Sequence, residues 1–167
     1  AGARDNTPVV LTGSADGTVT YGNDSVTVDA SHTEEGYLMV SYSGSNSKVK
    51  LQITGSDEIT YTYNLHDGYE TFPLTSGSGS YTVGVFENIE GTSYSTLFTQ
   101  AIDVTIQDEF GPYLYANQYV NFSADSKVIS KAMELSASAN DDLEVIENVY
   151  NYIITNFTYD YDKGASV

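Results

Sequence analysis

Apolar and polar positions follow two different rhythms along this chain, and the change falls near Ser123. Before it, short runs alternate between apolar and polar residues and are separated by Gly, Ser and Asn. A period of two is typical of strands that bury one face. After it, apolar residues recur at steps of three and four, the spacing of one helix face. The pattern predicts a β-rich region followed by a helical appendage.

The alternation is clearest in residues 48–54, where three apolar residues are separated by polar ones. We expect the apolar side chains to point into a core and the polar ones to point outward. The inward set is Val49, Leu51 and Ile53, and the outward set is Lys48, Lys50 and Gln52.

Further strands are expected at residues 37–42, 59–65, 69–74, 81–86 and 94–106, with a Gly-bearing turn at 87–93. About seven short strands with frequent turn signals are the pattern of an antiparallel sandwich. We therefore predict an immunoglobulin-like antiparallel β-sandwich over residues 34–110, one that lacks the Cys and Trp of antibody domains.

Residues 1–33 are polar and rich in Gly, Ser, Thr and Asp. Two short alternating runs, 18–21 and 25–28, flank the turn residues Gly-Asn-Asp at 22–24. This arrangement reads as a hairpin. We predict that residues 1–33 form a loose N-terminal segment with edge strands.

Residues 111–167 are predicted to form a linker and a two-helix hairpin. Asp141 can cap the second helix, and Glu144 stands where a capping-box partner reaches back. Each helix has one apolar face, and we expect the two faces to meet. The first face is Val128, Ile129, Ala132, Met133 and Leu135, and the second is Leu143, Ile146, Val149, Tyr150, Ile153, Ile154 and Phe157.

Charge and composition narrow the possible functions. Six Lys and Arg against 23 Asp and Glu give a formal net charge of −17, which argues against nucleic-acid partners. The chain has no Cys, so disulfides, Cys-ligated zinc and a Cys nucleophile are excluded. No apolar run approaches the ~20 residues needed to cross a bilayer, so we predict no membrane insertion. We predict no cofactor, no metal site and an extracellular or cell-surface location, with a signal peptide removed.

Several residues invite chemistry but have plainer explanations. His32 and His66 fall in predicted turns and are expected to be ordinary surface histidines. Asp160 and Asp162 could contribute to a calcium site, but too few oxygen ligands lie nearby, so we expect solvated carboxylates. The abundant Tyr side chains could stack on sugars, although in a sandwich they more often pack in the core. An isopeptide bond from Lys48 or Lys50 is disfavoured because both are expected to point outward.

Three stretches carry a resemblance to a known family. The stretches are residues 79–81 with the following VGVFEN, PYLYANQYVNF at 112–122, and DDLEVIENVYNYIITNFTYDYDKG at 141–164. They resemble parts of the N-terminal half of bacterial transglutaminase-like proteins. In that family a secreted β-domain precedes a papain-related core, and the two helices are the first elements of that core. The resemblance implies a Cys–His–Asp triad that acts on amide bonds and lies beyond this sequence.

The resemblance leads to two predictions of function. The first is a non-catalytic N-terminal region of a secreted or cell-surface transglutaminase-like enzyme, which positions or tethers the core. Because no residue of this chain matches the triad, we predict no catalytic site here. The alternative is a bacterial surface adhesion or binding module. We expect a protein or cell-wall partner, and a homodimer of this chain through Ile146, Val149, Ile153 and Phe157.

Overall fold

The structure is a computed structural model that describes residues 4–164. The chain divides into two compact units. One is Leu11–Asn121, and the other combines Ala1–Val10 with Phe122–Val167. Each is described by itself below.

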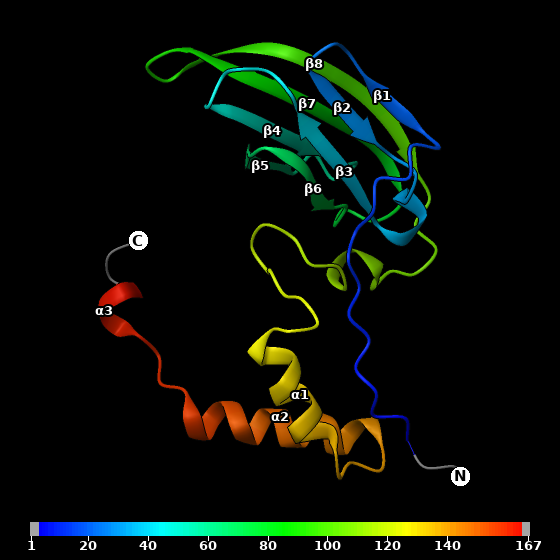
Figure 1. The fold of residues 1–167 in the computed structure, drawn as a ribbon, viewed down its shortest axis with the longest axis vertical. Coiled ribbons are helices and arrows are strands. Elements are labelled where there is room, and N and C mark those ends of the chain that lie inside the picture. The colour runs from blue at the N-terminus through cyan, green and yellow to red at the C-terminus, as the bar shows by residue number, and fades with distance from the viewer. Residues whose placement is uncertain (1–3, 165–167) are drawn as a thin grey trace. The chain divides into compact units, whose positions relative to one another are not determined.

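The first unit is an antiparallel β-sandwich of two four-stranded sheets (Figure 1). One sheet has the order β1-β2-β3-β6, formed by Thr20–Gly22, Val26–Asp29, Tyr37–Tyr42 and Gly68–Pro73. The other has the order β5-β4-β7-β8, formed by Thr60–Leu65, Val49–Thr54, Gly79–Glu90 and Ser93–Val104. The chain changes sheet between β3 and β4, between β5 and β6, and between β6 and β7. These crossings make the sandwich immunoglobulin-like, as predicted.

The predicted alternation of β4 is confirmed. Val49, Leu51 and Ile53 are buried, and the intervening Lys50 and Gln52 lie on the outer face of the sheet. The core between the sheets is completed by apolar residues from the other strands. Its largest fully buried members are Tyr81, Phe72, Leu38, Leu51, Ile53 and Leu74.

The N-terminal part of the sandwich differs from the prediction. β2 is not an edge strand, because it pairs with β1 on one side and with β3 on the other. Val26 and Val28 are fully buried and belong to the core, so the sandwich begins before residue 34. Two alternating valines are too few to signal a central strand in the sequence, but pairing on both sides makes β2 one.

The hairpin of β7 and β8 is also longer than predicted. The stretch 87–93, expected to be a turn, is strand up to Glu90 and again from Ser93. Pairing continues through two register irregularities, one of them between Asn88 and Glu90. The side-chain amide of Asn88 also donates to the Gly91 and Ser93 carbonyl oxygens. These bonds leave only the Gly91–Thr92 pair to reverse the chain.

Two 3-10 turns lie at one end of the sandwich. The first, Thr33–Glu35, is closed by Gly36, whose φ of 88° is left-handed. The second, Gly111–Tyr113, places Pro112 so close to Gly36 that a Cβ there would lie 2.5 Å from the proline ring. Glycine is thus required at position 36 by its backbone conformation and by this contact.

The second unit contains the predicted helical hairpin. Its helices are α1 (Lys127–Ser136), α2 (Asp142–Asn156) and the short α3 (Tyr161–Gly164). The Asp141 side chain accepts a hydrogen bond from the Glu144 backbone N–H, as predicted for the cap. Glu144 reaches back one residue further than expected, to the Asn140 backbone N–H at 2.7 Å.

The two helices meet along a face of α2 that was not predicted. The Asn148 side chain donates to the Leu135 carbonyl oxygen at 2.9 Å, and the Lys131 ammonium lies 5.1 Å from the Tyr152 ring centre. Val145 and Val149 are partly buried beside them. The predicted stripe is therefore wrong in orientation, and apart from Val149 its members lie in solvent. These are Leu143, Ile146, Tyr150, Ile153, Ile154 and Phe157, each at least 50% exposed.

Candidate functional site

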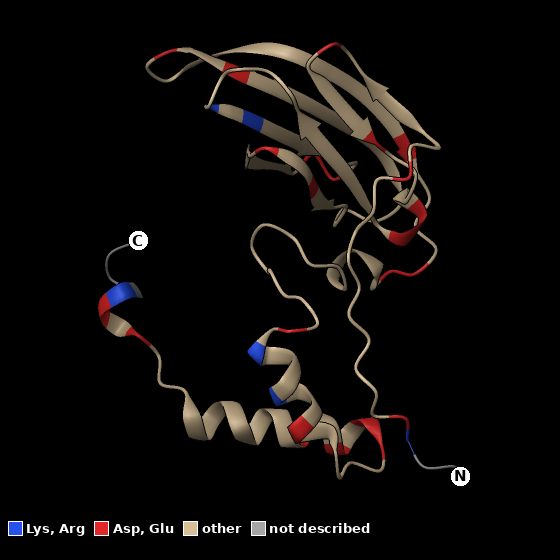
Figure 2. Ribbon diagram, in the orientation of Figure 1, with Lys and Arg blue, Asp and Glu red and all other residues tan. Residues whose placement is uncertain are grey.

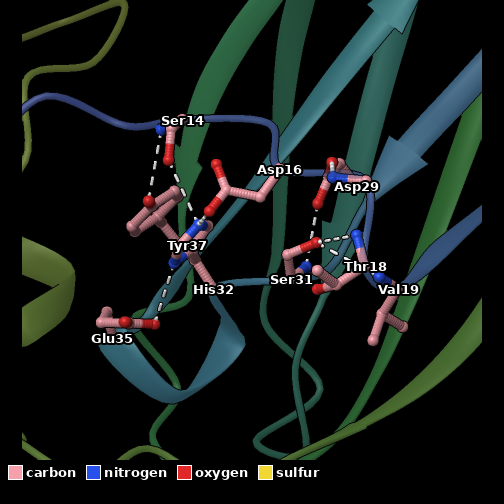
Figure 3. Close-up of polar contacts among 10 residues, drawn as sticks. Ser14, Asp16, Thr18, Val19, Asp29, Ser31, His32, Glu35 and Tyr37 are labelled. Atoms are coloured by element: carbon pink, nitrogen blue, oxygen red, sulfur yellow. Dashed lines mark hydrogen bonds and ion pairs between the residues drawn. The ribbon is translucent and has the colours of Figure 1, made fainter.

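A histidine held by two carboxylates joins several polar side chains of the sandwich (Figure 3). His32 lies in the turn that follows β2, immediately before the 3-10 turn Thr33–Glu35. Glu35 comes from that turn and Tyr37 begins β3. Ser14 and Asp16 come from the extended segment that precedes β1, so this site joins two parts of the chain that are distant in sequence.

Both ring nitrogens of His32 are engaged. Nε2 lies 2.9 Å from Asp16 Oδ2 and 3.2 Å from Ser14 Oγ. Nδ1 lies 3.4 Å from Glu35 Oε2. The ring stacks on Tyr37, with centres 5.3 Å apart and planes 11° apart, and the Tyr37 hydroxyl accepts from the Ser14 backbone N–H. The imidazole is therefore fixed on its edges and on one face.

Electrostatics favour the charged form of this histidine. Burial alone would lower the pKa of His32, but its hydrogen bonds to Asp16 and Glu35 outweigh burial and raise that pKa above its usual value. The hydrogen bonds from Ser14 and His32 lower the pKa of Asp16. The cluster thus stabilises an imidazolium between two carboxylates.

A Ser, a His and a carboxylate in contact suggest nucleophilic catalysis, but the geometry opposes it. A serine is activated when the ring nitrogen beside it is free to take its proton. Here Asp16 lies closer to that nitrogen than Ser14 does, so Nε2 is protonated and donates its hydrogen bond to the Asp16 carboxylate. The arrangement acts as a clasp that fastens the segment containing Ser14 and Asp16 to the turn after β2.

Asp29 extends the clasp at the end of β2. It is 2% exposed, and its carboxylate accepts from the Gly17 N–H at 2.6 Å and the Ser31 N–H at 2.9 Å. Burial would raise the pKa of Asp29, but these hydrogen bonds outweigh it and lower the pKa. The Ser31 hydroxyl in turn accepts from the Thr18 and Val19 N–H groups, so the residues that lead into β1 are also hydrogen-bonded to the turn after β2.

The second histidine, His66, helps to fasten the segment that contains Gln118. His66 Nδ1 lies 3.0 Å from Glu70 Oε1, and the His66 backbone N–H donates to Oε2 at 2.8 Å. The Gln118 side-chain amide donates to Glu70 Oε1 at 3.0 Å and to the Asn64 carbonyl at 2.7 Å. Burial would raise the pKa of Glu70, but these bonds outweigh it and lower the pKa.

The sequence reading of the histidines is thus corrected for His32. Its side chain is only 22% exposed, whereas that of His66 is 65% exposed, as expected of a surface residue. Ser14, Asp16 and Glu35 were missed as partners of His32. Only the spacing of His32 and Glu35 in one turn could have suggested a contact, because the other two partners come from a distant segment.

The acidic pair near the C-terminal end of the sequence has a local role. Asp160 Oδ1 accepts from the Lys163 backbone N–H at 3.0 Å and so caps the short helix α3. Within residues 4–164 no group of three or more His, Asp or Glu side chains is arranged to hold a metal ion. No helix in that range is long and apolar enough to span a membrane.

The fold and the clasp define an immunoglobulin-like β-sandwich module with a helical appendage. No family model matches the chain, and no curated protein matches it. A solved structure similar to it is the fn3 domain of the human collagen alpha-1(XX) chain, at 16% identity and a TM-score of 0.38. The match covers 56% of this chain and 90% of that domain. The fold class rests on the strand order described above and not on this likeness.

Proposed function

We propose that this chain is a non-catalytic region of a secreted or cell-surface transglutaminase-like protein. In this proposal the sandwich binds a partner or tethers the enzyme core, and the helical unit forms the first helices of that core. The whole protein would transfer or hydrolyse acyl groups of amide bonds with a Cys nucleophile that this chain does not contain.

One observation carries the proposal: the long helix α2 has an uncovered apolar stripe. Ile146 and Ile153 lie on one face of α2 and are 63% and 50% exposed, and Phe157, which follows the last turn of the helix, is 64% exposed. A contiguous apolar surface of this kind usually marks an interface. The stripe lies within residues 141–164, one of the stretches that resemble the transglutaminase-like family, so the rest of such a core is its expected partner.

The coding sequence downstream of Val167 tests this proposal. An in-frame Cys motif followed by a His and an Asp would support it. A stop codon or a run of cell-wall repeats at that position would contradict it. In a longer protein with a Cys motif, replacing that Cys by Ala should abolish amine incorporation into glutamine peptides while leaving the sandwich folded.

A second candidate is a surface binding module in which the sandwich itself carries the function. The observation that favours it is a hollow on the outer face of the sheet β5-β4-β7-β8, which contains Lys50 and is lined by no acidic side chain. The side chains around Lys50 also indicate which kind of ligand would bind, as argued from their chemistry below.

A further inference from the structure

The outer face around Lys50 forms a hollow of about 520 Å³. Its walls combine one cation, two aromatic rings and three uncharged polar side chains, and none of them is acidic. They are Lys50, Gln52, Thr62, Phe86, Thr92 and Tyr94.

The charge of this face contrasts with the rest of the chain. Lys48 and Lys50 are the only Lys or Arg residues between positions 11 and 121, in a chain whose net charge is −17. In the sandwich of Figure 2, blue marks only the start of β4. An anion is repelled over most of this protein, so the hollow is the favourable place for one on the sandwich.

Among residues 4–164, Lys50 has no carboxylate partner. Its Nζ lies 5.1 Å from the centre of the Tyr94 ring, and it makes no ion pair with any residue in the described range 4–164. In the helical unit, by comparison, Arg4 and Lys131 pair with Asp142 and Glu134. The Tyr94 ring thus holds an ammonium whose charge is unneutralised.

The floor of the hollow offers an apolar ring beside hydrogen-bonding groups. Gln52 pairs in register with Thr62 on one side and with Gly84 on the other. A Cβ at Gly84 would lie 2.8 Å from the Phe86 ring, so the missing side chain lets that ring lie along the sheet. The Gln52 amide donates to the Thr62 hydroxyl at 3.3 Å, which leaves the amide oxygen and a second N–H for a ligand.

A neighbouring hollow extends this surface. It measures about 300 Å³, contains Lys48, Asn64 and His66, and shares Tyr94 with the first. A ligand longer than one small ring can therefore span both, with a lysine in each.

We propose that this face binds an acidic saccharide. A sugar ring would stack on Phe86, its hydroxyls would bond Gln52 and Thr62, and its carboxylate would pair with Lys50. The second lysine, Lys48, would take the carboxylate of the next residue of the saccharide. This assignment rests on the sandwich being a binding module and goes further by naming the ligand.

An acidic peptide fits the same face less well. Extended peptides bind sheets mainly by adding a strand to a free edge. β4 has no free edge, because it is paired with β5 and with β7 along its length. Only side chains are available here, and most of them suit hydroxyl groups.

The test is a titration of the 167-residue chain with trigalacturonate, followed through backbone amide signals in NMR spectra. Shifts should be confined to Lys50, Gln52, Phe86 and their neighbours. Lys50→Gln should raise Kd about tenfold, the loss of one charge-assisted hydrogen bond. Phe86→Leu, which keeps an apolar side chain, should also weaken binding, whereas Lys127→Gln in α1 should leave Kd unchanged.

Three results would overturn the assignment. The first is no shift on β4 and β7 at millimolar trigalacturonate in a folded protein. The second is equal affinity for neutral galactotriose. The third is a hexaglutamate peptide that binds as tightly and with the same dependence on Lys50. The proposed function is tested by the coding sequence after Val167, whereas the ligand is tested by this titration. Failure of one can therefore be told apart from failure of the other.

Discussion

Nε2 of His32 lies 2.9 Å from Oδ2 of Asp16, and this contact joins the segment before β1 to the turn after β2. The bond closes a loop that contains the whole β1–β2 hairpin. Because β1 pairs only with β2 over three residues, its sheet contacts are few. The clasp therefore supplies much of the order of the sandwich's N-terminal edge.

The first prediction concerns the pH dependence of this clasp. The pKa of His32 is raised in the folded state, so its stabilisation is fully present below the unfolded value of about 6.5 and is lost as pH rises through the folded pKa. The pKa of Asp16 is lowered, so its contribution is present above its unfolded value and is lost as pH falls through the folded pKa. Together they stabilise the clasp most in mildly acidic solution.

His32→Gln should therefore lower the free energy of unfolding of the sandwich by about 1 kcal/mol near pH 5, and by less near pH 8. Urea denaturation of both proteins at the two pH values measures the difference. His66→Gln is the comparison, because that side chain is 65% exposed and Glu70 keeps its hydrogen bonds from the His66 backbone N–H and the Gln118 amide. A His32→Gln effect that grows as pH rises would contradict the assignment of a charged clasp.

Sequence reasoning succeeded where the determining pattern is local. The alternation in residues 49–54 and the Asp141 cap each depend on a few neighbouring residues, and both were found. It failed for β2 because a strand's place in a sheet depends on pairing with distant residues. The His32 site was missed for the same reason, since Asp16 has no sequence pattern that links it to a turn beyond β2. On α2, apolar spacing identified the helix, but packing against α1 selected a face that includes Asn148.

The second prediction tests the core between the sheets. Leu51 is fully buried on the central strand β4, so Leu51→Ala should lower the free energy of unfolding by about 3 kcal/mol through lost burial and a cavity. Leu143→Ala makes the same change at a side chain that is 75% exposed. It should alter stability by less than about 0.5 kcal/mol. Equal effects in thermal unfolding would mean that the two-sheet core is placed incorrectly.

The third prediction separates backbone strain from packing at Gly36. Gly36→Ala places a non-glycine residue in a left-handed backbone conformation and a Cβ against the Pro112 ring. It should lower the free energy of unfolding by about 2 kcal/mol or more. Gly77→Ala is matched, because Gly77 also has a positive φ of 74° but has nothing within 4 Å of the added Cβ. It should cost only about 1 kcal/mol. Similar losses in urea midpoints for the two variants would show that Gly36 and Pro112 are not in contact.

The last prediction concerns the uncovered stripe of α2 in the isolated 167-residue chain. Each large apolar side chain left in water forgoes roughly 1.5–3 kcal/mol of burial, and six such side chains are exposed along α2 and at its C-terminal end. Two copies can cover the stripe by a twofold arrangement, in which the same patch is used on both. We therefore expect a homodimer at micromolar concentration. Of the four residues first assigned to it, Val149 is turned towards α1, so Ile146, Ile153 and Phe157 carry the contact.

Sedimentation velocity should show a species of twice the 18.1 kDa monomer mass. Ile153→Asp with Phe157→Asp should return the chain to a monomer, because it places two charges in the apolar interface. Asn151→Asp with Thr155→Asp adds the same charge to the polar face of the same helix and should leave the dimer intact. Circular dichroism of both variants would establish that α2 is still formed. A wild-type chain that sediments as a monomer at every concentration would remove the dimer, and equal dissociation by both double variants would assign the effect to net charge instead of the stripe.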